Sequence, residues 1–264
     1  MKEKVLFFDI DGTLVDNAYG VDEVPEGVKR ELKRIQNEGH KLFICSGRPK
    51  AMINQQFLDL GFNGYVLYHG GYIEIDGESI FEERMDTELA TQTVDMLEEL
   101  HCDYMIETAH HIYIDKRYME LYTFFKDLGM EEMFSMDFDR DDVLKRAIKI
   151  EANKDKQKVS DYLDGKFGTT ISFDQHGSDN SFEFFSPTMS KAVGIKRVIE
   201  HYGLDIKDTY AFGDGLNDIE MIQLCQVGVA MGNAVDELKA QADIICKPID
   251  KNGLEDILKT LFPQ

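Results

Sequence analysis

Two aspartates stand at the end of a hydrophobic run near the N-terminus. The run ends in Asp9 and Asp11, and Gly12 follows. In open parallel sheets, ligands bind beyond the carboxyl ends of the strands, and a glycine there lets the chain turn away sharply. Two carboxylates at such a place repel each other unless a cation is present, so the pattern predicts a Mg²⁺ site. A carboxylate can also attack phosphorus and form an aspartyl phosphate; the alternative is a strand end whose acids only form a turn.

Short polar segments at two other predicted strand ends could bind phosphate or metal. Ser46 and Gly47 precede a predicted helix, where a hydroxyl and a backbone amide suit a phosphate oxygen. The same pair can be a plain helix cap and turn. Asp214 ends a predicted strand in the way that Asp9 does, and it could complete the metal site.

Three residues at predicted helix starts are candidates for the same site. The charge of Lys191 opposes the dipole of its helix, and this mismatch indicates a role such as neutralising a phosphate. A solvated surface lysine is the alternative. Asn217 and Asp218 open the next helix, where a functional role and ordinary capping are both consistent with the pattern.

The elements around these residues alternate between strand and helix at both ends of the chain. The predicted strands are residues 5–8, 42–45, 65–68, 209–212, 226–230 and 244–246. The predicted helices are residues 25–38, 49–60, 190–201, 217–224, 235–240 and 254–261. This order predicts an α/β fold, a doubly wound parallel sheet with helices on both faces. All the candidate residues then lie at strand C-termini or helix N-termini of one domain, where they can converge on one crevice.

The middle of the chain has a different pattern. Asp76-Gly77 is a strong hairpin signal between strand-like residues 72–75 and 79–81. Further predicted strands are residues 104–107, 112–114, 146–151, 170–173 and 181–185, and further predicted helices are residues 87–100, 117–128 and 156–163. These elements predict an inserted α+β domain over residues 83–187, within a core formed by residues 1–82 and 188–264.

Composition excludes several classes of function. The net charge of -21 disfavours nucleic-acid binding, because phosphate backbones would be repelled. No apolar run approaches the roughly 20 residues that cross a bilayer, and the N-terminus lacks a signal peptide, so we expect a cytoplasmic protein that does not bind membranes. The four cysteines form no CxxC pair, which favours buried thiols over disulfides or a zinc site.

The candidate motifs together resemble those of a known family. Asp9-Ile10-Asp11-Gly12-Thr13 resembles the first motif of the haloacid dehalogenase superfamily. Motifs two, three and four are similar, in the same order, to Ser46-Gly47-Arg48, Lys191 and Gly213-Asp214-Gly215-Leu216-Asn217-Asp218. The insert resembles the C2-type cap of the Cof-type (subclass IIB) phosphatases, and residues 229–234 are also typical of that group. The resemblance covers essentially the whole chain.

The resemblance implies a role for each matching residue. Asp9 would be the nucleophile, and Asp11 would protonate the leaving oxygen and then activate water. Mg²⁺ would be bound by the carboxylates of Asp9 and Asp214 and the backbone carbonyl of Asp11. The phosphoryl oxygens would be held by Ser46, Gly47, Lys191 and Asn217. The supporting residues would be Asp218, which orients Lys191 or the metal waters, Arg48, which contacts cap or substrate, and Gly12 and Thr13 of the first motif.

Histidines supply one departure and one weak alternative. Residues 68–71 read Tyr-His-Gly-Gly, where the group often has an Asn-Gly-Ala type of sequence, so substrate preference could differ. For His69 a polar contact is expected rather than a catalytic role. His110 and His111 could be read as a metal pair, but adjacent strand residues point to opposite faces.

The prediction is therefore a Mg²⁺-dependent phosphatase of small phosphorylated metabolites, such as sugar phosphates, acting as a monomer or weak homo-oligomer. One alternative is a phosphomutase that returns the phosphate of the aspartyl intermediate to a sugar. Another is a non-catalytic protein that binds phosphometabolites. Loss of Asp9 or Asp11 would have favoured that last alternative, and both are present.

Overall fold

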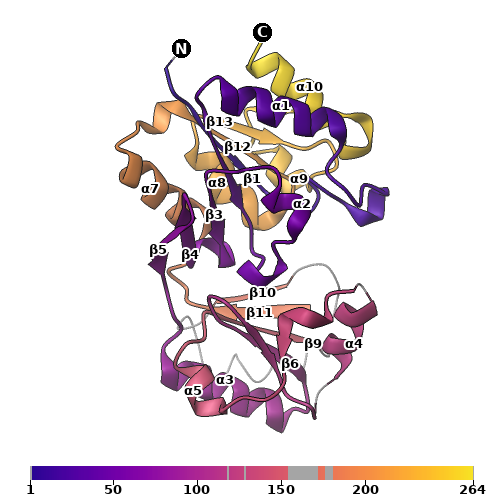
Figure 1. Ribbon diagram of the computed structural model, residues 1–264, viewed down its shortest axis with the longest axis vertical. Coiled ribbons are helices and arrows are strands. Elements are labelled where there is room, and N and C mark those ends of the chain that lie inside the picture. The colour runs from indigo at the N-terminus through magenta and orange to yellow at the C-terminus, as the bar shows by residue number, and fades with distance from the viewer. Residues whose placement is uncertain (1, 118, 128, 154–171, 176–180, 264) are drawn as a thin grey trace. The chain divides into compact units, whose positions relative to one another are not determined.

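The computed structural model describes residues 2–117, 119–127, 129–153, 172–175 and 181–263. It divides into two compact units (Figure 1). The first unit comprises Met1–Arg48, Ile53–Phe81 and Ser190–Gln264, and the second comprises Pro49–Met52 and Glu82–Met189.

The first unit is built on an eight-stranded sheet in the order β14-β13-β12-β1-β2-β3-β4-β5. The strands are β1 (Val5–Phe8), β2 (Lys41–Cys45), β3 (Gly64–Leu67), β4 (Tyr72–Ile75), β5 (Glu78–Glu82), β12 (Thr209–Gly213), β13 (Val227–Ala230) and β14 (Ile244–Ile245). Every neighbouring pair from β14 to β3 is parallel, and β4 runs antiparallel to β3. The predicted doubly wound parallel sheet is confirmed.

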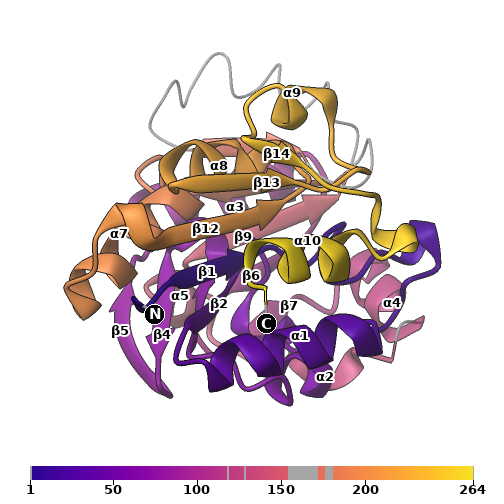
Figure 2. The same ribbon diagram turned by 90° about the horizontal axis from the view of Figure 1, so that it is seen from above.

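Helices cover both faces of this sheet. They are α1 (Glu26–Asn37), α2 (Gln55–Leu58), α7 (Lys191–Tyr202), α8 (Ile219–Leu224), α9 (Asp236–Lys239) and α10 (Gly253–Leu261). Val5 and Phe7 belong to one hydrophobic cluster with apolar residues of α7, α8 and α9. The alternate residues Leu6 and Phe8 are equally buried, as expected for a parallel sheet whose strands are covered on both sides. Figure 2 shows α1 beside α10, and the two helices are in contact.

Two predicted helices need correction. A single helix over residues 49–60 was wrong, because Ile53 and Asn54 separate a 3₁₀ turn (Lys50–Met52) from α2, and the backbone of Asn54 is extended (φ -79°, ψ 175°). An extended residue with a short polar side chain is typical of a helix start and not of a helix interior. The helix predicted over residues 217–224 begins instead as a 3₁₀ turn, Leu216–Asp218, before α8.

The second unit is an α+β structure with a six-stranded sheet in the order β10-β11-β9-β6-β7-β8. Its elements are α3 (Thr87–Glu99), β6 (Asp103–Glu107), β7 (Ile112–Ile114), α4 (Glu120–Asp127), β8 (Phe134–Ser135), α5 (Arg140–Leu144), β9 (Lys149–Asn153), β10 (Ser172–Gln175) and β11 (Ser181–Phe185). All neighbouring strands are antiparallel except β7 and β8. One hydrophobic cluster joins α3 and α5 to the sheet, and another joins α4 to β6 and β7. The helix predicted over residues 156–163 lies outside the described residues.

Two smaller expectations concern cysteines and membranes. Three of the four cysteines are buried, as predicted, and Cys246 is partly exposed. In the part of the chain that the structure describes, every helix is too short or too polar to cross a bilayer.

Candidate active site

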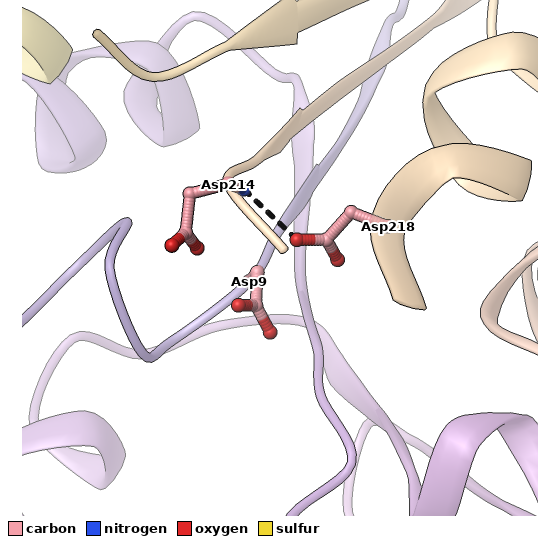
Figure 3. Close-up of side chains that lie close together, drawn as sticks. All are labelled: Asp9, Asp214 and Asp218. Carbon is pink, nitrogen blue, oxygen red and sulfur yellow. Dashed lines mark hydrogen bonds between the residues drawn. The ribbon is translucent and has the colours of Figure 1, made fainter. Parts of the chain in front are cut away.

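The carboxyl ends of β1 and β12 bring two aspartates together. These strands are parallel neighbours in which Phe8 pairs with Phe212, so the residues that follow them also lie near each other. The backbone N–H of Asp9 donates to the carbonyl of Phe212 at 2.9 Å. Asp9, Asp214 and Asp218 each present a carboxylate oxygen, and these three oxygens lie within 4.8 Å of one another (Figure 3).

A buried lysine neutralises part of this cluster. Lys191 begins α7 after the N-cap residue Ser190, and its side chain is fully buried. Its Nζ donates to Asp9 Oδ1 at 2.7 Å and to Asp218 Oδ1 at 2.5 Å. Burial acts to lower the pKa of Lys191, but the charges of Asp218 and Asp9 outweigh it and raise that pKa overall. The lysine is therefore a permanent cation at the end of β1.

Asp218 uses both of its oxygens inside the protein. Oδ1 accepts from Lys191, while Oδ2 accepts from the backbone N–H groups of Asp214 (2.9 Å) and Gly215 (3.0 Å). The turn that follows β12 is thereby tied to the lysine. With its oxygens engaged in this way, Asp218 is suited to supporting the site, and Asp9 and Asp214 are better placed to bind an added cation.

The electrostatics of Asp9 and Asp214 fit a divalent cation. Burial, followed by the charge of Asp218, raises the pKa of Asp9 from 3.8 to about 7, against the opposing effect of Lys191. Burial, followed by the charges of Asp9 and Asp218, raises the pKa of Asp214 from 3.8 to about 8. A buried and a partly buried carboxylate that ionise with difficulty on their own gain most from a hard cation with oxygen ligands, such as Mg²⁺.

The turn after β1 is shaped to accommodate Asp214. Gly12 has a left-handed φ of 77°, and a Cβ added to it would lie 1.9 Å from Asp214 Oδ2. Thr13 Oγ1 donates to Asp214 Oδ1 at 3.4 Å. Asn233 Nδ2 donates to the carbonyl of Gly12 at 2.7 Å. Sequence reasoning gave Asn233 no role, although it stands in the stretch that resembles the family.

The side chain of Asp11 lies apart from the three-carboxylate cluster. It forms a bidentate ion pair with Arg48, whose Nε and Nη2 donate to its two oxygens at 2.8 and 2.6 Å. The Asp11 side chain is 63% exposed, whereas that of Arg48 is 23% exposed. The guanidinium also lies over the ring of Phe57, 5.7 Å from its centroid. The structure thus joins the first and second motifs through one charged pair.

The second motif reaches the same edge of the sheet at the end of β2, which pairs with β1. Ser46 is buried, and its Oγ accepts from the backbone N–H of Arg48 at 3.2 Å. Gly47 lies against the ring of His69, because an added Cβ would be 2.6 Å from Cε1. Asn217 is partly exposed in the turn before α8.

The alternative metal pair His110 and His111 lies elsewhere. Both residues are exposed and occupy the connection between β6 and β7 instead of a strand. Within the described ranges, the only group of three or more potential metal-binding side chains is that of Asp9, Asp214 and Asp218.

Comparison with known proteins gives this arrangement a family. The family model of the haloacid dehalogenase-like hydrolases matches residues 6–258. The chain belongs to the haloacid dehalogenase-like hydrolases. Similar proteins from Bacillus subtilis (strain 168) include "Putative phosphatase YkrA", 30% identical over 270 residues that cover 99% of this chain and 98% of YkrA. They also include "5-amino-6-(5-phospho-D-ribitylamino)uracil phosphatase YitU", 25% identical over 281 residues that cover 99% and 98%.

Solved structures of similar proteins share the fold of the hydrolase. The HAD subclass IIB sugar phosphatase BT4131 superposes with a TM-score of 0.84 at 26% identity, covering 98% of each chain. A protein from Geobacillus kaustophilus superposes with a TM-score of 0.86 at 28% identity, again over 98% of each chain. Family and relatives together identify this hydrolase as a phosphatase.

Proposed function

We propose that this phosphatase hydrolyses small phosphomonoesters, sugar phosphates or similar compounds, through an aspartyl phosphate on Asp9, with Mg²⁺ as cofactor. The observation that carries the proposal is the position of Asp9. Its Oδ1 is held by a buried lysine at 2.7 Å, and its carboxylate lies beside those of Asp214 and Asp218. A nucleophile fixed by a cation at a strand end is suited to phosphoryl transfer, which depends mainly on positioning and charge stabilisation.

The reaction proceeds in two displacements. Asp9 Oδ2 attacks phosphorus while Lys191 holds Oδ1, and the bond from phosphorus to the ester oxygen breaks. The leaving oxygen takes a proton from Asp11. Water then attacks the phosphorus of the aspartyl phosphate and gives a proton to Asp11, and the bond between phosphorus and Asp9 breaks. Phosphate leaves, and both aspartates return to their starting states.

The donor groups of the chain divide between metal and phosphate. The carboxylates of Asp9 and Asp214 and the backbone carbonyl of Asp11 would hold Mg²⁺, which when bound supplies positive charge that offsets the carboxylates and the phosphoryl oxygens. The phosphoryl oxygens would be bound by Ser46, Gly47, Lys191 and Asn217. Ser46 and Gly47 belong to the segment after β2, and Lys191 begins α7.

Substrate size and class are inferred from the relatives. The similar structure BT4131 is named a sugar phosphatase, and YitU is named for a phosphorylated ribitylaminouracil. Sugar phosphates and the phosphorylated ribitylaminouracil are both small and polyhydroxylated. We assign the second unit the task of selecting the leaving group.

The test is phosphate release from a panel of phosphomonoesters, measured with Mg²⁺ and with EDTA. Release that requires the metal and concentrates on a few sugar or polyol phosphates supports the proposal. Turnover that requires a sugar bisphosphate and yields an isomeric monophosphate would instead show a phosphomutase. No release from any compound would overturn the hydrolytic function.

Asp9→Asn tests the nucleophile directly. The amide retains the shape of the carboxylate but cannot form the acyl phosphate, so we expect kcat to fall by more than about a thousandfold. Asp22→Asn, at an exposed position, is the matched control and should keep full activity. Turnover of Asp9→Asn within tenfold of the parent would remove the assignment.

A further inference from the structure

Three successive residues after β3 have a left-handed backbone. The φ angles of Tyr68, His69 and Gly70 are 52°, 51° and 93°. Glycine adopts such angles freely, but tyrosine and histidine do so at a cost in free energy. Both of these side chains are buried, with relative exposures of 0% and 5%. Strained residues of this kind persist only where the surroundings hold them, and they cluster at functional sites.

The strained turn is tied to the phosphate-binding segment that follows β2. The backbone N–H of Tyr68 donates to the carbonyl of Arg48 at 3.3 Å, and that of His69 donates to the carbonyl of Ser46 at 3.4 Å. Both bonds are long for N–H···O contacts. The two hydrogen bonds nevertheless hold the turn alongside the Ser46–Arg48 segment.

The same turn is packed against the start of the helix that carries Lys191. A Cβ added to Gly70 would lie 2.2 Å from the carbonyl oxygen of Ser190, and one added to Gly194 would lie 3.0 Å from the Cα of Gly70. Ser190 is the N-cap residue of α7. Backbone meets backbone here, so a shift of the turn would displace the start of α7.

The imidazole of His69 packs against Gly47 of the second motif. A Cβ added to Gly47 would lie 2.6 Å from Cε1 of the ring and 2.8 Å from Nε2. The ring is thus in contact with the residue whose amide is expected to bind a phosphoryl oxygen. On backbone grounds alone, glycine would be the better residue at position 69, so the ring has to offset the strain.

We propose that His69 is a positioning residue for phosphate binding. Its imidazole supports Gly47, and its strained backbone links the Ser46–Arg48 segment to the start of α7, so that Gly47 and Lys191 are held at a fixed separation. This inference rests on the proposed function, because it takes Gly47 and Lys191 to be the groups that hold the phosphoryl oxygens. The ring acts through Gly47 and needs no contact of its own with the substrate.

His69→Gly separates positioning from folding. Glycine relieves the backbone strain, which offsets part of the packing lost with the ring, so the variant should stay folded with little change in its melting temperature. The phosphate site should nevertheless loosen, so KM and the inhibition constant of inorganic phosphate should both rise about tenfold, with a smaller change in kcat. The KM and the phosphate inhibition constant of His69→Asn should lie between those of the parent and those of His69→Gly. Asparagine tolerates the left-handed backbone but is shorter than histidine.

Two results with the His69→Gly variant would contradict the proposal. Unchanged KM and phosphate inhibition in a folded His69→Gly variant would overturn the proposal. So would a lower melting temperature with unchanged phosphate binding, which is the signature of packing alone. Calorimetric titration of inorganic phosphate with Mg²⁺ present gives a readout without turnover, so a failure of the proposed activity can be distinguished from a failure of this inference.

A double-mutant cycle with Gly47→Ala tests the contact itself. The added methyl group would overlap the His69 ring, so the single variant should bind phosphate weakly. Removing the ring in Gly47→Ala/His69→Gly should restore part of that binding, which means that the two changes are not additive. Strictly additive losses would show that the ring does not position Gly47.

Discussion

At the scale of single residues, the ion pair between Asp11 and Arg48 constrains the proposed reaction. Both carboxylate oxygens of Asp11 accept hydrogen bonds from the guanidinium, so while the pair holds neither oxygen is available to the leaving group. Asp11 must therefore separate from Arg48 before it can act as the acid of the first displacement. Because its side chain is largely exposed, separation exchanges the pair for water at a small cost.

Asp11→Asn should leave the first displacement fast and make hydrolysis of the aspartyl phosphate slow. A p-nitrophenolate leaving group needs no proton, so the first displacement should persist on p-nitrophenyl phosphate. Hydrolysis of the aspartyl phosphate should slow about a hundredfold or more, because the base that activates water is lost. Rapid mixing should then show a burst of about one equivalent of p-nitrophenol followed by slow turnover. Slow release without a burst would contradict the second role of Asp11.

The sequence predicted which residues lie together at the sheet edge better than it predicted the contacts that each of them makes. Asp9 and Asp214 follow hydrophobic strands, so their meeting at one edge of the sheet could be inferred from the order of elements. The pairing of Asp11 with Arg48, 37 positions away, could not. Nor could the bond from Asn233 to Gly12, 221 positions away. Such contacts depend on side-chain directions that only the folded backbone defines.

At the scale of elements, the second unit buries a charged cluster in its sheet. Lys149 of β9 is fully buried, with its Nζ 3.3 Å from Glu107 Oε2 of β6 and in contact with Glu183 of β11. Burial raises the pKa of Glu107 well above its ordinary value, with Lys149 acting in the opposite direction. Three strands are thus cross-linked by charge on one face, where hydrophobic periodicity gives no signal.

Lys149→Met should destabilise the protein strongly. It removes the cation and leaves the two buried glutamates without it, so we expect a loss of about 3–5 kcal/mol in the free energy of unfolding. Denaturant titration would measure the loss. Lys145→Met, which changes an exposed lysine nearby, should have little effect. Equal stability of the two variants would show that the cluster contributes nothing.

Elements with strong periodicity were predicted well, whereas the short elements α5 and β8 were missed. The strand at β1 and the helix at α7 agree with the sequence to within a residue or two. The two-residue strand β8 has no pattern to detect. The left-handed turn that ends β3 depends on packing against α7, which local sequence does not encode.

At the scale of the whole molecule, the charge of -21 makes a bound cation important. Asp9 and Asp214 have pKa values raised from 3.8 to about 7 and about 8 in the folded protein. The folded state therefore binds more protons than the unfolded state between about pH 4 and pH 8, so this contribution to stability is lost as the pH rises through that window. A metal ion competes with the same protons and replaces the lost contribution.

We therefore expect Mg²⁺ to raise the melting temperature more at about pH 8 than at about pH 6. Melting curves with Mg²⁺ and with EDTA at both pH values would measure the difference. Asp214→Asn should reduce both the metal effect and its pH dependence, because one titrating ligand is gone. A Mg²⁺ shift that is equal at the two pH values, or larger at the lower one, would contradict this competition.

The interrupted first unit also has a consequence for biosynthesis. During synthesis β1 can pair with β12 only after Phe212 has been added, about 200 residues after its pairing partner Phe8. At typical translation speeds this takes about 10–40 s. Much of the second unit leaves the ribosome in the meantime. Its elements α3, β6, β7 and β9 all lie between residues 87 and 153. We therefore expect the intervening unit to gain structure before the catalytic centre exists, so that a nascent chain becomes an enzyme only when its last third arrives.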